Sequence, residues 1–408
     1  MDNAANNDTT TTGLERLIPT FAGMLWRIRC ILHILNLIAK VCIIIIIIIA
    51  YSSAILAHFT KQMKRKKSNN STSTTATPEE EILNDDLAEA PAMQENEELD
   101  DIAIADEDEA SAVLDAAQVV HDNGVIKTGV FIASNEQKRA EGIIPKVSGL
   151  ARRVNDSSSV LKPEFERLVA STPELRTDKT ALSRRVPTRW NSEYSCLCDH
   201  ILLRKPVEQL TGQSQLKLSA YRLNALQWPL AKELRNLLKI FLDATNAFSR
   251  KETPLIGEAV ELLEDIIHSL KTIRDSEFSP NGNLVSPIIR VAAHSGVLVA
   301  EKYFKLLNEC EVYVIAMVMS PEKKLQWFSN CGWSQEKVAE ITEHILGRWM
   351  QTYVSLPTTS ASSASSTVPH AINPSSMSLG SWCNAPFYDI YEAIDALEKS
   401  MRREKVGN

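Results

Sequence analysis

The sequence of 408 residues predicts a mainly helical protein that is interrupted by long disordered segments. Two observations predict this fold class. Apolar residues recur at spacings of three and four over several stretches, which is typical of helices with one buried face. Between and after these stretches lie segments rich in acidic residues or in Ser, Thr and Pro. Such segments bury too little apolar surface to offset the entropy lost on ordering.

Composition is that of a protein with a packed core, because 44% of the residues are hydrophobic and 23% are charged. The length allows about two to three domains. The net charge of −7 is unevenly distributed, since residues 79–109 contain fifteen Asp or Glu and no Lys or Arg. The rest of the chain therefore carries +8. This basic remainder is compatible with contact to nucleic acid.

The seven cysteines are odd in number and have no framework spacing, which argues against a secreted disulfide-bonded fold. The polar first residues show no signal peptide, so we expect a reduced intracellular compartment. The stretch CLCDH at 196–200 raises the hypothesis of a metal site. Residues two apart do not share a helix face, which favours the interpretation as ordinary, partly buried side chains.

The first part of the chain divides into three segments. Residues 1–40 are predicted to be a polar loop followed by an amphipathic helix, and residues 41–59 are an apolar run. Residues 60–144 are a low-complexity linker that is first basic and then acidic. The buried face of the first helix is predicted from 3–4 spacing, and its members are Leu25, Ile28, Leu32, Leu35 and Ile38 with Ala39.

Residues 145–352 have a mostly helical pattern, and residues 353–408 are predicted to be a Ser/Thr/Pro linker with a short terminal helix. Within the helical region we expect helices at about 228–248, 255–274, 285–307 and 334–353. Pro229 suits the first turn of a helix. Ser334 is a good N-cap, and Glu336 in the first turn suits the helix dipole.

Three stretches, in order along the chain, resemble the hAT superfamily of DNA transposases, especially copies found in fungal and plant genomes. They are DNAANND at 2–8, RCILHILNL at 29–37 and VPTRWNSEY at 186–194. Two longer stretches are also similar to the family, at 234–255 in its helical insertion and at 311–333 in the segment after it. The resemblance covers roughly 1–40 and 145–352.

The resemblance implies an RNase H-like core, in which three acidic groups hold two divalent metals for in-line phosphodiester chemistry. The implied fold is a mixed α/β remnant of that core, dominated by helices of the insertion. Asp2 matches the second acid of the family, and Cys30 with His33 matches its C-x-x-H motif. Arg189 and Trp190 match its R-W pair, whose tryptophan is implied to stack on a flipped base. Simple core packing of Trp190 is the alternative.

Two departures from the family change the expected activity. Asp2 is the one acid of three that is matched, so we expect no strand transfer and no bound cofactor in this form, although the family uses Mg²⁺. The family's C-terminal dimerisation segment is also unmatched, which leaves homo-oligomerisation open. The expected residual function is DNA binding in the nucleus, through Arg184, Arg185, Arg189 and Trp190.

The apolar run at 41–59 supports a different hypothesis, a single-span membrane protein with a cytoplasmic helical domain. Its nineteen residues could span about 30 Å of hydrocarbon, and basic residues follow it. Ser52, Ser53 and His58 dilute it, and a retained intron or repetitive tract would also explain it. The two hypotheses exclude each other, because the family fold needs 1–40 and 145–352 to share one core.

Overall fold

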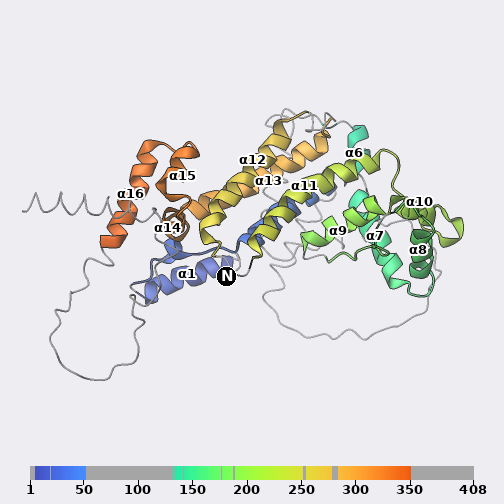
Figure 1. The fold of residues 1–408 in the computed structure, drawn as a ribbon, viewed down its shortest axis with the longest axis horizontal. Coiled ribbons are helices and arrows are strands. Elements are labelled where there is room, and N and C mark those ends of the chain that lie inside the picture. The colour runs from blue at the N-terminus through green and yellow to red at the C-terminus, as the bar shows by residue number, and fades with distance from the viewer. Residues whose placement is uncertain are drawn as a thin grey trace, which may run out of the picture. The chain divides into compact units, whose positions relative to one another are not determined.

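A computed structural model describes residues 5–18, 20–51, 132, 134–140, 142–175, 177–186, 189–250, 254–277 and 284–350. These residues form α-helices and short 3-10 helices, with no strand among them (Figure 1). The predicted dominance of helices is therefore confirmed, whereas the sheet of an RNase H-like core is not among the described elements. The predictions for Asp2, for most of the 60–144 linker and for 353–408 fall outside the described residues.

The described chain forms two compact units. Unit 1 comprises residues up to 253 together with 260–309, and unit 2 comprises residues 254–259 and those from 310 onward. The amino-terminal segment and the helices after the acidic tract thus belong to one unit. The helices of unit 1 are α1 (Ala5–Leu17), α2 (Ile31–Tyr51), α6 (Ser134–Ala140), α7 (Ile143–Asp156), α8 (Leu161–Ala170), α9 (Trp190–Leu202), α10 (Arg204–Gly212), α11 (Gln227–Phe248), α12 (Ala259–Asp275, of which Ala259 belongs to unit 2) and α13 (Pro287–Asn308).

Helix α2 begins at Ile31, six residues later than the sequence predicts. Leu25 lies in a short 3-10 helix, η1 (Gly23–Trp26), and is exposed, as are Ile28 and Leu32. The predicted buried face is therefore wrong at its first three positions. The segment before α2 is held extended because Arg27 and Arg29 turn inward and pair with Asp8 of α1.

From Ile34 onward α2 is buried around most of its circumference, including the isoleucines Ile43–Ile47. Its partners are helices from much later in the sequence, above all α13, and also α6, α11 and α9 (Figure 1). The predicted shared interior of 1–40 and the region after 145 is present. None of the helices in the described ranges qualifies as a candidate membrane span.

The closest approach of α2 and α13 is made possible by Gly296. A Cβ atom at this position would lie 2.7 Å from the sulfur of Cys42 and 3.1 Å from a methyl group of Leu270. Neighbouring positions on α13 are also small, including Ala292, Ala293 and Ser295, and all are buried. Small side chains let two helix backbones approach, so the isoleucine-rich helix α2 packs closely against α13.

The predicted helix starts of the later region are confirmed with small shifts. α11 begins at Gln227 with Pro229 in its first turn, and α13 begins at Pro287 after the extended residue Ser286. Both placements fit a proline, whose missing N–H is one of the unpaired donors at a helix start. The inner face of α11 includes Leu230, Leu234 and Phe241, all buried as the spacing predicts.

Unit 2 contains η4 (Ile256–Glu258), α14 (Glu311–Met319), α15 (Lys324–Asn330) and α16 (Gln335–Trp349). Ser334 is the N-cap of α16, and its hydroxyl accepts a hydrogen bond from the backbone N–H of Lys337, as predicted. Glu311 at the start of α14 is buried and accepts hydrogen bonds from His344 at 2.8 Å and Arg348 at 2.9 Å. These bonds fasten α16 to α14.

Replacing Gly296 with alanine should destabilise unit 1 by about 1–3 kcal/mol, because the added methyl group would overlap Cys42 in a packed core. Denaturant unfolding followed by circular dichroism measures the change. Gly212→Ala is the matched control, since a Cβ there meets no atom within 4 Å. That control should be neutral or stabilising by up to about 1 kcal/mol. Equal stability of the two variants would contradict the close approach of α2 and α13.

Candidate nucleic-acid interface

The stretch VPTRWNSEY leads into α9, and the start of that helix contacts α2. Arg189 is extended at the N-cap, and Trp190 is the first helical residue. The backbone N–H of Trp190 donates to the side-chain oxygen of Asn36, on α2, at 3.4 Å. The first N–H groups of a helix have no partner within the helix, so Asn36 supplies one from another element. The stretches RCILHILNL and VPTRWNSEY therefore meet at the start of α9.

The indole ring of Trp190 lies in the core. It is 3% exposed and makes edge-to-face contacts with Phe241 at 6.0 Å and Tyr194 at 6.4 Å between ring centroids. Aromatic pairs in this geometry stabilise a core beyond the burial of their area. In this conformation the ring offers no face to a nucleotide base, so the structure favours the core-packing alternative for Trp190.

Neighbouring arginines before α9 lie in opposite environments. The side chain of Arg184 is 63% exposed and makes an ion pair with Asp156 at 3.2 Å. The side chain of Arg185 is 11% exposed and pairs with the buried Glu193 at 2.9 Å. An exposed pair contributes little stability, so Arg184 can exchange its partner for a phosphate. The ion pair with Glu193 instead holds the side chain of Arg185 in the interior.

Arg189 completes the exposed basic group. It is exposed, and its side chain makes no hydrogen bond or ion pair with any residue in the described ranges. The surrounding region 145–222 is also basic, with fourteen Lys or Arg and eight Asp or Glu. Arg184 and Arg189 therefore place positive charge beside the start of α9, as expected of a phosphate-binding surface.

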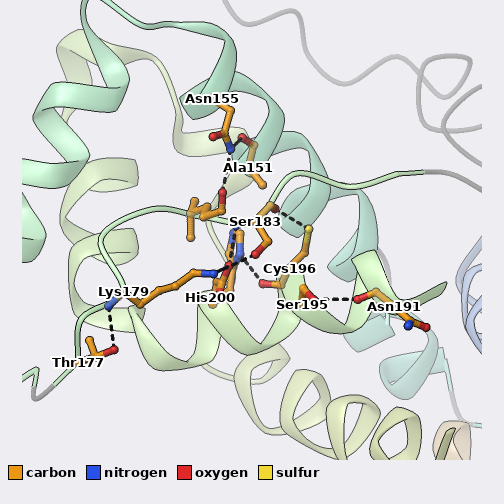
Figure 2. A network of polar contacts seen from close by, with 11 residues as sticks. Ala151, Asn155, Thr177, Lys179, Ser183, Asn191, Ser195, Cys196 and His200 are labelled. Atoms are coloured by element: carbon orange, nitrogen blue, oxygen red, sulfur yellow. Dashed lines mark hydrogen bonds and ion pairs between the residues drawn. The ribbon is translucent and has the colours of Figure 1, made fainter. Parts of the chain in front are cut away.

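A polar network holds the loop that carries Arg184 and Arg185 (Figure 2). On α9, Asp199 accepts the backbone N–H of Ser183 at 2.6 Å and lies 3.2 Å from the ammonium group of Lys179. On α7, the amide of Asn155 donates to the carbonyl of Leu182 at 2.9 Å. Leu182 and Ser183 are thus held from two helices, so the backbone that leads to Arg184 is pre-organised.

The CLCDH residues take part in the same network. The thiol of Cys196 donates to the carbonyl of Ser183 at 2.8 Å, and Nδ1 of His200 donates to the carbonyl of Cys196 at 2.9 Å (Figure 2). Burial raises the pKa of Cys196 to about 12 and lowers that of His200 to about 4. Across the described ranges, no three His, Cys, Asp or Glu side chains are grouped as a metal site.

The remaining predicted site residues are Cys30, His33 and Asp2. Cys30 and His33 are half-buried at the start of α2. Asp2 is not among the described residues. The residues that sequence reasoning missed are Asn36, Asp199 and Glu193, which position the loop and the start of α9. Asn36 stood within RCILHILNL, but nothing in the sequence shows a contact that spans 154 residues.

Comparisons with protein-family models, with curated proteins and with solved structures found no match for this chain.

His200 should make the stability of unit 1 depend on pH. Its pKa is lowered from 6.5 to about 4 by burial, so the folded state keeps the ring neutral while the unfolded chain takes up a proton. The free energy of unfolding should be retained above about pH 6.5 and fall by up to about 3 kcal/mol as the pH drops towards 4. Urea unfolding of the wild type and of His200→Gln across this range measures the difference.

His200→Gln should lose this dependence of the free energy of unfolding on pH, because the substitution removes the group that titrates. His268→Gln is the control, since His268 is exposed on α12. A wild-type slope that persists unchanged in His200→Gln would contradict the assignment.

Proposed function

We propose that this chain derives from the hAT transposases and binds DNA through the exposed arginines beside the start of α9, without cleaving it. One observation carries the proposal. The two stretches that best carry the resemblance, on α2 and α9, pack in one unit and share the bond from Trp190 to Asn36. Under this proposal the helices of unit 1 belong to the family's helical insertion and its neighbouring RNase H-like core.

The surface chemistry supports binding to the DNA backbone. Arg184 follows the loop residues that Asp199 and Asn155 hold, and Arg189 is exposed at the N-cap of α9. Guanidinium groups bind phosphate through paired hydrogen bonds, and a fixed loop loses less entropy on binding than a mobile one. We propose no cleavage, because two-metal chemistry needs three acidic groups and the resemblance assigns one, Asp2.

The burial of α2 favours this proposal over a single-span membrane protein. A membrane span would need the isoleucines of α2 to face lipid, whereas Ile43–Ile47 are covered by helices of the same unit. Leaving these partners would also expose the apolar surface of α13. We therefore propose a nuclear location, because the chromosomal DNA that the protein would bind is found there.

Removing both exposed arginines should weaken DNA binding and its dependence on salt. Each phosphate contact contributes about −0.9 to the slope of log affinity against log salt concentration. Between about 50 and 200 mM salt, the loss of affinity should therefore be about 12-fold smaller for Arg184→Ala with Arg189→Ala than for the wild type. Fluorescence anisotropy with a labelled duplex measures this.

The control is Lys239→Ala with Lys305→Ala, which removes the same charge from exposed positions on α11 and α13. Adding EDTA should leave the wild-type affinity unchanged, because no metal takes part. Absence of salt-dependent binding by the wild type would refute the proposed function. Equal effects of the two double variants would refute the assigned surface.

A further inference from the structure

The pair of Arg185 and Glu193 stands out because it buries an arginine next to an exposed one. Arg184 and Arg185 are adjacent in the chain, yet their side chains are 63% and 11% exposed. Residues 183–186 alternate between half-buried and exposed, as successive side chains do along an extended chain, so Arg185 lies on the inward side. Its guanidinium group meets a carboxylate that is itself 4% exposed, on the first turn of α9.

We propose that Glu193 is a positioning residue that withholds Arg185 from the DNA surface and so limits the number of phosphates the protein contacts. This inference rests on the proposed function and concerns the regulation of the same site. Neutralising Glu193 would release Arg185 beside Arg184 and add a phosphate contact.

The contacts of Glu193 explain how it holds the arginine. One carboxylate oxygen of Glu193 accepts from Nε of Arg185 at 2.9 Å. The neighbouring hydroxyl of Ser192 accepts from the backbone N–H of Val186 at 2.8 Å, and its proton has its nearest acceptor in the carbonyl of Arg189 at 2.7 Å. Glu193 therefore holds the side chain of Arg185, while Ser192 holds the backbone beside it.

The electrostatics make this arrangement sensitive to the charge of Glu193. Burial raises the pKa of Glu193, and the positive charges of Arg185 and, from α2, of Lys40 act in the opposite direction. The buried carboxylate and the buried guanidinium thus depend on each other. Once one partner of such a pair loses its charge, the other is a buried and unpaired charge, which destabilises the folded state.

Arg185 has a way to avoid that cost. Val186 next to it is exposed, as is Arg184, so this part of the loop lies at the surface. A long arginine side chain can keep its apolar stem in place while its guanidinium group reaches water. Without the carboxylate, the outward position beside Arg184 becomes the favourable one.

Glu193→Gln tests the inference, because it removes the charge while keeping the shape. The variant should bind duplex DNA more tightly than the wild type at low salt. Its loss of affinity between about 50 and 200 mM salt should be about 3.5-fold larger, the effect of one further phosphate contact. A role limited to structure would weaken binding or leave the slope unchanged, so a gain separates the two.

Glu193→Gln combined with Arg185→Gln should return the salt dependence to the wild-type value. The matched control is Glu208→Gln, which removes the same charge from an ion pair with Arg204 on α10. Thermal unfolding of each variant confirms that it folds. If Glu193→Gln alone unfolds, its combination with Lys40→Met, which also removes the buried charge of α2, repeats the test.

The two proposals fail in different ways. A wild type without salt-dependent binding refutes the proposed function. A wild type that binds, together with a folded Glu193→Gln whose slope is unchanged or equals that of the Glu208→Gln control, overturns the inference about Glu193 alone.

Discussion

The packing of α2 against α13 is the constraint on which unit 1 depends. α2 carries the isoleucine run, and this apolar surface must be covered. Gly296 and its small neighbours let the two backbones approach, so that the isoleucines meet a closely fitting surface. Because the two helices are far apart in the sequence, their contact brings the amino-terminal segment into the interior formed by the later helices.

The position of α2 then determines the surface around α9. Asn36 reaches the start of α9, and Lys40 places a positive charge near Glu193. Glu193 pairs with Arg185 in the interior, while the ring of Trp190 packs against Phe241 of α11. Arg184 and Arg189 remain exposed and form a short basic surface. Its chemistry suits phosphate groups rather than bases, because its aromatic residue is enclosed.

Local sequence patterns predicted much of the helical structure. The spacing of apolar residues located α11, α12, α13 and α16, and Ser334 was identified as an N-cap, because these features depend on neighbours within one or two turns. The start of α2 was placed too early. Apolar spacing continued back to Leu25, but the pairing of Arg27 and Arg29 with Asp8 holds that segment extended.

Some features of the candidate surface follow from the sequence alone, and others depend on the tertiary structure. By itself the sequence determined the residue types near 184–190, the basic character of the region and the apolar nature of the isoleucine run, since these follow from composition and order. The tertiary structure alone decided that Arg184 faces water while Arg185 and Trp190 face the interior. Exposure depends on which distant helices cover a side chain, and for this loop the deciding groups lie on α2, α9 and α11.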